Sequence, residues 1–224
     1  MKRNQRGSIN HHGHAIAGEA QVPLNAGMQA RFVVFRDAVG DDQVAVIVGT
    51  PDLSKPVPVR IHSACLTGDV FGSRRCDCGD QLQLALERLQ EVGGGIILYL
   101  QQEGRGVGLA NKMRAYKLQD GGLDTFAANR ALGHGDDDRE DLVAAQMLAA
   151  LDVRRVTLLT NNPQKADALV AHGIEVVHRV PTGASTSPTG TATPPCTCSR
   201  PAGTTCTRGA SRAPGRASSA SPTA

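Results

Sequence analysis

Three cysteines crowd into fourteen residues, and this spacing is the strongest constraint on how the chain can fold. Ten residues separate Cys65 from Cys76, and one residue separates Cys76 from Cys78. The long gap supplies a loop that can fold back, and the Cys-x-Cys pair delivers two sulfurs from one turn. All three sulfurs can therefore converge on one ion. Zinc with three protein ligands keeps a fourth position for water, which is the catalytic arrangement rather than the structural one.

The alternative to a metal site is three unconnected reduced cysteines. The stretch from Cys65 to Cys78 carries two arginines and two aspartates, and buried structural cysteines are unusual in such a polar loop. The next cysteine is Cys196, so no fourth thiol lies at the spacing of a zinc finger. The pattern therefore favours an open zinc site over a structural one.

Composition excludes several classes of partner. The 224 residues carry a formal charge of only +3, with no Trp and two Tyr, so neither a polyanion-binding surface nor a base-stacking platform is expected. No apolar run reaches transmembrane length, and the N-terminus lacks the apolar block of a signal peptide. Ligand-like cysteines indicate a reducing compartment. We expect a cytoplasmic protein with no nucleic-acid or membrane partner.

The composition divides the chain into three parts. Residues 1–18 are polar and basic, and we expect a flexible N-terminal extension. Residues 19–181 carry the periodic apolar patterns and form the expected catalytic domain. Residues 182–224 are almost wholly Ala, Ser, Thr, Pro, Gly and Arg, with no aliphatic residue larger than Ala. Such a tail cannot bury enough apolar surface to offset chain entropy, so we expect it to be disordered.

The apolar patterns predict an α/β fold with antiparallel strands in the front half and a βαβ unit in the back half. Runs rich in β-branched residues predict strands, and leucines at helical spacing predict helices. Strands are expected at 31–36, 44–48, 57–61, 96–100, 155–160 and 174–180, and helices at 80–91, 109–119, 139–151 and 163–171.

A glycine-rich turn at residues 101–109 leaves one strand and opens a helix. Glycines there let backbone N–H groups approach a phosphate, and a helix N-terminus favours anions. The spacing is neither the dinucleotide fingerprint nor a Walker loop, and an ordinary turn would explain the glycines alone. Glu103 and Arg105 favour a site, because a carboxylate can accept two neighbouring N–H groups of guanine while an arginine binds phosphate.

Two other helix starts have two readings each. Arg139 follows a run of acids that would serve as ordinary caps, and it is either ion-paired scaffolding or a guanidinium held for a phosphate. Thr160 and Lys165 flank the start of another helix at the end of a strand, the usual ligand position in α/β sheets. A plain N-capped turn with a surface lysine explains these two residues equally well.

Taken together, four motifs resemble GTP cyclohydrolase II, the first enzyme of riboflavin synthesis. They are R-I-H-S-x-C-L-T-G-D with R-C-D-C-G, Q-E-G-R-G-V-G-L-x-x-K, D-D-R-E-D and L-T-N-N-P-x-K, and they run in unbroken order from about Val57 to Pro181. The resemblance implies a homodimer that binds one Zn²⁺ per subunit and uses Mg²⁺ with the GTP phosphates. The implied products are formate, pyrophosphate and 2,5-diamino-6-(5-phosphoribosylamino)pyrimidin-4(3H)-one.

The resemblance also implies roles for individual residues. Cys65, Cys76 and Cys78 align with the zinc ligands. Arg139 aligns with a nucleophile that attacks the α-phosphate, Asp137 with a proton acceptor, and Tyr116 with a catalytic tyrosine close to the substrate. The implied GTP contacts are Arg60, Ile61, His62, Ser63, Gln81, Glu103, Gly104, Arg105, Thr125, Thr160 and Lys165.

The chain departs from the family pattern at three places. Ala64 stands where a glutamate is usual, and Gln101 stands where an arginine is usual. The tail resembles GC-rich DNA read out of frame, so we expect the missing family segment in another frame after the codon for Pro181. Two alternatives stay open: an inert zinc- and nucleotide-binding paralogue, or an enzyme that stops at the ring-opened formamide. With no fused second catalytic domain in the sequence, a monofunctional protein is expected.

Overall fold

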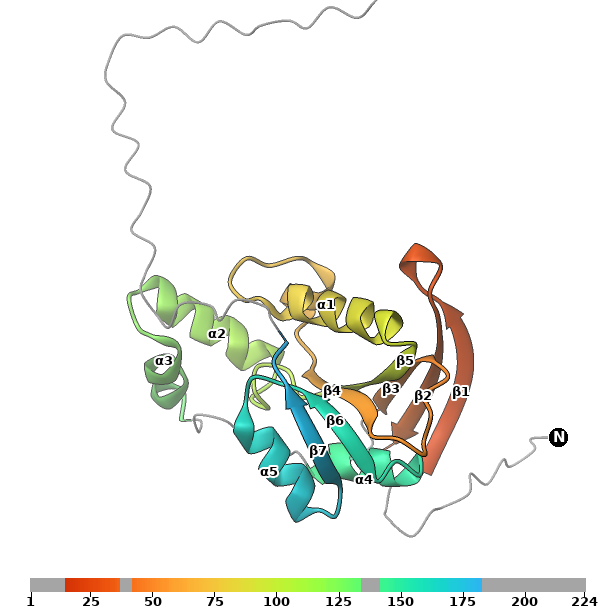
Figure 1. The fold of residues 1–224 in the computed structure, drawn as a ribbon. Coiled ribbons are helices and arrows are strands. Elements are labelled where there is room, and N and C mark those ends of the chain that lie inside the picture. Colours follow the sequence, from red (N-terminus) through yellow and green to blue (C-terminus); the bar gives the residue numbers. More distant parts are fainter. Residues whose placement is uncertain (1–14, 37–41, 134–141, 183–224) are drawn as a thin grey trace, which may run out of the picture. The chain divides into compact units, whose positions relative to one another are not determined.

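A computed structural model of the chain describes residues 15–36, 42–133 and 142–182. Within these residues the strands form one seven-stranded sheet in the order β1-β2-β3-β5-β4-β6-β7 (Figure 1). The strands are β1 (Ala15–Pro23), β2 (Gln29–Arg36), β3 (Asp42–Gly49), β4 (Val57–Ser63), β5 (Gly94–Leu100), β6 (Arg155–Leu159) and β7 (Glu175–Val180). The helices are α1 (Cys78–Glu91), α2 (Leu109–Asp120), α3 (Thr125–Ala131), α4 (Leu142–Ala150) and α5 (Pro163–Ala171).

The sheet is antiparallel in its first half and parallel in its second. The pairs β1–β2, β2–β3 and β3–β5 run antiparallel, whereas β4–β5, β4–β6 and β6–β7 run parallel. The predicted division into an antiparallel front half and a βαβ back half is therefore confirmed. Parallel strands need long crossovers, and here α1 connects β4 to β5 while α5 connects β6 to β7.

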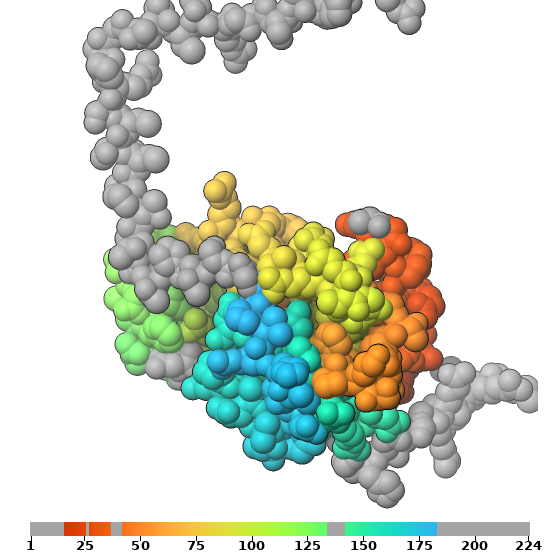
Figure 2. All heavy atoms as spheres, viewed as in Figure 1, coloured from red at the N-terminus to blue at the C-terminus, as the bar shows by residue number. Residues whose placement is uncertain are grey.

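Helices cover both faces of the sheet, which is why the central strands are apolar on both sides. Val46 and Ile97 pack with Leu89 of α1 on one face. Ile47 and Leu98 belong to the core on the other face, where α4 and α5 lie. In Figure 1, α1 lies on one side of the sheet and α4 on the other, and Figure 2 shows the β6–α5–β7 unit in cyan and blue beside the yellow α1.

The order and direction of the strands predict where a ligand crevice lies. Strands β4 and β6 are parallel neighbours, and the helices that follow them pack on opposite faces of the sheet. Ligands in open α/β sheets bind outside the carboxyl ends of strands at such a switch point. The residues that follow β4 include Cys65, and those that follow β6 include Lys165.

The structure differs from the sequence predictions at both ends and in two further elements. Strand β1 begins at Ala15, so residues 15–18 of the predicted flexible extension form a strand. Helix α3 and one π-helical turn, η2 (Leu66–Val70), were not predicted. Both are short, and their apolar residues lack a clear period. Thr182 is buried and donates its N–H to Asn161, so the structured part extends past Pro181.

The start of the helix predicted at 139–151 and the tail after Thr182 lie outside the described residues. Among the helices that the structure describes, none has the length and apolarity needed to cross a membrane.

Candidate metal centre and nucleotide pocket

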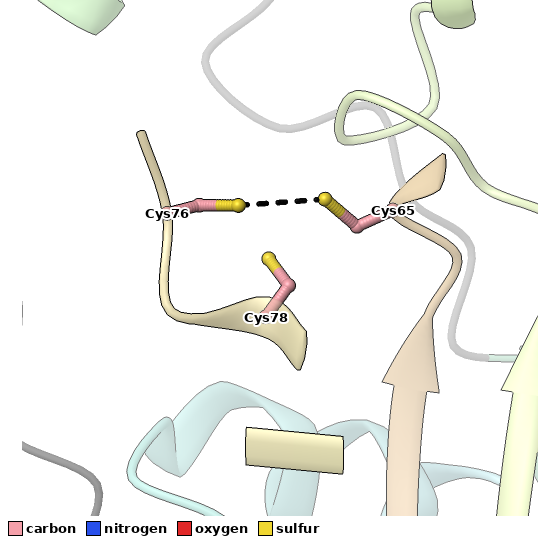
Figure 3. Close-up of side chains that lie close together, drawn as sticks. All are labelled: Cys65, Cys76 and Cys78. Carbon is pink, nitrogen blue, oxygen red and sulfur yellow. Dashed lines mark hydrogen bonds between the residues drawn. The ribbon is translucent and has the colours of Figure 1, made fainter. Parts of the chain in front are cut away.

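The three thiols predicted to bind metal lie together in the folded chain. Cys65 follows β4, Cys76 lies before α1, and Cys78 is the first residue of that helix, so the three side chains point toward one another (Figure 3). Their Sγ atoms all lie within 4.8 Å of one another, and those of Cys65 and Cys76 are 3.5 Å apart. Sulfurs that bind one tetrahedral zinc at about 2.3 Å are separated by about 3.8 Å. The donor set and spacing fit a metal ion.

Gly68 shows how closely the loop packs around the sulfurs. A Cβ atom at this position would lie 2.9 Å from Sγ of Cys76, 3.0 Å from Sγ of Cys65 and 3.1 Å from Cβ of Cys78. Gly68 therefore belongs to the cradle itself, because any larger residue would push the thiols apart. Its backbone N–H also hydrogen bonds to the Cys65 thiol. A glycine in this turn is consequently as constrained as the cysteines.

The electrostatics of the cluster oppose three bare thiolates. Burial and the neighbouring sulfurs raise the pKa of Cys78 well above its usual range, and burial also raises the pKa of Cys76. At Cys65 burial acts in the same direction, but hydrogen bonds from Lys112 and Gly68 outweigh it and lower the pKa. Cys65 is thus the thiol whose ionisation the surroundings favour, and a bound cation would favour ionisation of the other two.

The loop that carries the three thiols, Cys65 to Cys78, is called the metal loop below. Asp69 is a buried carboxylate that ties this loop to the sheet. Its oxygens lie 3.1 Å from Nε2 of His62, and they accept the Tyr99 hydroxyl at 2.9 Å and the Cys65 N–H at 3.0 Å. Burial alone would raise the pKa of Asp69, but these hydrogen bonds, with that of His62 the strongest, lower it. The His62 ring stacks on Tyr99 with centroids 5.5 Å apart. The network fixes the backbone at Cys65.

A cavity of about 540 Å³ opens beside the thiols. Its walls come from the metal loop, the glycine-rich turn and the residues after β6. The predicted site residues that line it are Arg60, Ile61, His62, Ser63, Cys65, Cys76, Cys78, Gln81, Glu103, Gly104, Arg105, Tyr116, Thr125 and Lys165. Asp137 and Arg139 lie outside the described residues.

Thr160 is the one predicted contact among the described residues that does not line the cavity. It is buried, and its Oγ1 accepts the backbone N–H of Asn162 at 3.1 Å. The Asn162 side chain in turn accepts the Gln164 N–H at the start of α5. The hydroxyl of Thr160 thus caps a turn. A capped turn was one of the two interpretations that the sequence allowed, and phosphate binding was the other.

Two cations near the switch point are oriented by neutral acceptors. Arg60 donates to the carbonyl of Leu159 at 3.1 Å and to Oε1 of Gln81 at 2.7 Å. Lys165 donates to the carbonyl of Ile61 at 3.2 Å. These bonds orient two positively charged side chains that line the cavity.

The glycine-rich turn has a left-handed backbone. Gly104, Gly106 and Gly108 have φ of 64°, 88° and 84°, and Arg105 between them has φ 65°. A non-glycine residue in this region is strained by about 1–3 kcal/mol, and such strain clusters at functional sites. The Arg105 guanidinium lies 5.0 Å from the centre of the Phe126 ring. The glycines were identified from the sequence, but the strain at Arg105 was not.

Glu103 contacts the protein through both carboxylate oxygens. Oε2 accepts the Leu66 N–H at 2.7 Å, and Oε1 accepts Nζ of Lys112 at 2.7 Å. Lys112 also donates to Sγ of Cys65 at 3.0 Å. The sequence predicted a role for Glu103 but none for Lys112, although the i, i+4 spacing of Lys112 and Tyr116 places both on one face of α2.

Tyr116 extends from α2 toward the metal loop. Its hydroxyl is 3.5 Å from Oγ1 of Thr67, and the Arg75 guanidinium lies 4.8 Å from the centre of its ring. Arg75 is also ion-paired with Asp120, so the loop is fastened to the helix that carries Tyr116. The sequence did not predict that Asp69, Tyr99 and Arg75 support the site. Asp69 and Tyr99 are 30 residues apart, and Arg75 and its partner Asp120 are 45 residues apart.

Of the two substituted family positions, Ala64 lies at the site. Ala64 is buried and lines the cavity. The Gln101 backbone N–H donates to Oε1 of Gln43 at 2.8 Å, and this contact does not depend on its side chain. Ala64 therefore leaves room beside the metal loop where the family pattern has a carboxylate.

Comparison with known proteins agrees with the geometry. The family model described as GTP cyclohydrolase II matches residues 14–181. A GTP cyclohydrolase-2 of Xylella fastidiosa is 53% identical over 169 residues, which cover 75% of this chain and 42% of that protein. A GTP cyclohydrolase-2 of Azospirillum brasilense is 49% identical over 164 residues, covering 73% and 43%.

A riboflavin biosynthesis protein RibBA of Porphyromonas gingivalis is 47% identical over 164 residues, covering 73% of this chain and 40% of that protein. The chain thus spans about two fifths of the length of these curated relatives. The family match nevertheless covers nearly all the described residues, including the whole cavity and thiol cluster. The chain belongs to the GTP cyclohydrolase II family.

Proposed function

We propose that this protein hydrolyses GTP to 2,5-diamino-6-(5-phosphoribosylamino)pyrimidin-4(3H)-one, formate and pyrophosphate, the first step of riboflavin biosynthesis. The observation that carries the proposal is the cavity. It is lined at once by the three thiols and by ten of the eleven GTP contacts that the family resemblance implies. Its volume of about 540 Å³ suits a ligand of nucleotide size.

Zn²⁺ held by Cys65, Cys76 and Cys78 is the proposed metal, because three thiolates suit zinc and leave one position open. When bound, it would act as a Lewis acid that favours ionisation of water near neutral pH. Mg²⁺ is proposed to accompany the GTP phosphates. The tight packing of Gly68 against all three cysteines supports a site shaped for an ion rather than a chance gathering of thiols.

The chain's own residues would hold the nucleotide across the cavity. Arg60 and Lys165 are proposed to bind phosphate oxygens, since both side chains are anchored by neutral acceptors at the switch point. Arg105, on the strained turn, is proposed as a third phosphate ligand. Glu103 is proposed to recognise guanine N–H groups next to the metal loop. Tyr116 would lie close to the reacting ring.

Arg139 and Asp137 keep the roles that the resemblance implies, as proposals. Arg139 would attack the α-phosphate, form a phosphorus–nitrogen bond and expel pyrophosphate, and Asp137 would take its proton. Arginine is strongly basic, so proton removal must accompany the attack. An Arg139→Ala variant should lose pyrophosphate release, and release at the native rate would remove the nucleophile role.

A homodimer in the cytoplasm is also proposed, and size-exclusion chromatography with light scattering tests the dimer. Composition further leads us to propose that the tail after Thr182 lies outside the catalytic domain. A chain ending at Thr182 should then retain formate production, and loss of activity with an intact fold would contradict this.

Product analysis distinguishes the proposed function from its two rivals. The purified protein is incubated with GTP, Mg²⁺ and Zn²⁺, and formate, pyrophosphate and the mass of the pyrimidine are measured. Free formate with the deformylated pyrimidine supports the full reaction. A product that retains the formyl group indicates an enzyme that stops at the formamide, and unchanged GTP indicates an inert paralogue. A Cys76→Ser variant run in parallel shows whether any turnover depends on the thiol cluster.

A further inference from the structure

Lys112 in α2 contacts both halves of the proposed site at once. Its Nζ atom lies 3.0 Å from Sγ of Cys65 and 2.7 Å from Oε1 of Glu103. The side chain is only 11% exposed and lines the cavity. Nothing in the family comparison assigns it a role here. A nearly buried ammonium group between a proposed metal ligand and a proposed guanine ligand requires a physical account.

The fold fixes the position of this ammonium group. The Glu103 carboxylate is held by the N–H groups of Leu66 at 2.7 Å and of Gly104 at 3.1 Å, so the acceptor of Lys112 is itself anchored by backbone. Gly104 packs against the helix: a Cβ there would lie 3.1 Å from Cβ of Lys112. The glycine-rich turn and the lysine are therefore built as one unit.

The chemistry of the cluster explains what such a group can do. Three thiolates and one divalent ion together carry one net negative charge, and the site is partly buried. A cation that hydrogen bonds to a ligating sulfur offsets this charge and draws electron density from the metal–sulfur bond. Groups behind metal ligands tune affinity in this way, and their loss typically costs about 10–100-fold in metal affinity or activity.

We propose that Lys112 is a positioning residue of the metal centre, whose ammonium group hydrogen bonds to the metal-ligating sulfur of Cys65 and sets the strength of that bond. The inference rests on the proposed metal centre. It also couples the two halves of the site, because the same ammonium group orients Glu103. The competing account is a plain Lys–Glu ion pair that stabilises the turn without acting on the metal.

Cobalt substitution separates the two accounts. Co²⁺ replaces Zn²⁺ in thiolate sites and gives a sulfur-to-cobalt charge-transfer absorption that reports directly on the ligands. Lys112→Met keeps the length of the side chain and removes its charge. Lys117→Met, an exposed lysine on the same helix, is the matched control. Each protein is titrated with Co²⁺ alone, and Zn²⁺ affinity is measured by competition with a chromophoric chelator.

We expect Lys112→Met to bind both ions about 10-fold more weakly, because the ammonium group no longer offsets the negative charge of the loaded cluster. Its charge-transfer band should move to lower energy, since a thiolate without a hydrogen bond donates electrons more readily. Lys117→Met should match the wild type in both measurements. A purely structural ion pair predicts a lower melting temperature for Lys112→Met with an unchanged spectrum and affinity. That result overturns the inference.

Two further comparisons keep the test decisive. In the double variant Lys112→Met/Glu103→Gln, no Glu103 carboxylate is left without its lysine partner. This variant can therefore be measured if the single variant does not fold. It should show the same shift, and a wild-type spectrum would contradict the proposal. Absence of any charge-transfer band in the wild-type protein would instead overturn the metal centre itself. A normal wild-type band with an unshifted variant overturns the role of Lys112 alone.

Discussion

The two walls of the cavity are built in different ways. The metal-loop wall depends on contacts between side chains far apart in sequence: Asp69 with Tyr99, Lys112 with Cys65, and Glu103 with the Leu66 N–H. Beside the cavity, the turn after β6 is held by local contacts, in which Oγ1 of Thr160 accepts the Asn162 N–H and the Asn162 side chain accepts the Gln164 N–H. Lys165, which lines the cavity on this side, donates to the carbonyl of Ile61.

The difference indicates a division of labour. The metal-loop wall gathers the three thiols beside the buried charges of Asp69 and Lys112, which suits the assembly of a metal centre. Where β4 and β6 lie side by side, carbonyl and amide oxygens position the cations Arg60 and Lys165. We therefore expect changes on the first wall to affect metal binding, and changes on the second to affect affinity for the nucleotide.

The largest effect is expected on the metal-loop wall. Cys76→Ser removes one sulfur from the cluster while conserving size, and a hydroxyl is a much weaker zinc ligand than a thiolate. Zinc affinity and formate production should each fall by more than about 100-fold, beyond the usual loss for residues behind the ligands. Metal content is measured by elemental analysis. Ser54→Ala, on an exposed loop, is the control, and a variant that keeps its zinc would contradict the proposed site.

The matching change on the β6 wall is Lys165→Met, which retains the packing of the buried stem and removes the charge. A hydrogen bond to a charged group contributes about 1.5–3 kcal/mol, so we expect KM for GTP to rise about 10–100-fold. Zinc content should not change. Steady-state kinetics and elemental analysis of the same preparation check both points. Loss of zinc in this variant would break the distinction between the two walls.

Asp69→Asn tests the support of the metal loop. The carboxylate is 3% exposed, and the weakened hydrogen bonds should cost about 1–3 kcal/mol of unfolding free energy. Because the pKa of Asp69 is lowered in the folded state, its contribution is present above about pH 4 and is lost as the pH falls through the folded-state pKa. Urea unfolding at pH 7 and pH 3 measures the difference, which should shrink at the lower pH. A constant difference would show that charge is not involved.

The smallest effect is expected from Asn162→Ala, which removes the N-cap of α5. Loss of such a cap typically costs about 1 kcal/mol. The side chain does not line the cavity, so KM and zinc content should stay unchanged. Thermal unfolding and kinetics measure both quantities. A raised KM would mean that this local turn contributes directly to nucleotide binding.

Sequence reasoning reached far because much of the fold is encoded locally. Alternating β-branched runs identified β2 to β7, leucine spacing identified α1, and Asn162-Pro163 marked the start of α5. The thiol cluster could be predicted because sequence spacing limits where the sulfurs can meet. Strand β1 was missed because its small and polar residues resemble the preceding extension, and α3 because seven residues give no clear period.

By itself, the sequence determined the α/β class, the antiparallel and parallel halves, and which cysteines gather at one point, since all three follow from spacing and period along the chain. Only the tertiary structure decided that Thr160 caps a turn while Lys112 reaches the metal loop. Such contacts join residues such as Lys112 and Cys65, 47 positions apart, and no local pattern encodes them. Their geometry is set by how β4, β5 and α2 pack, which the folded chain alone defines.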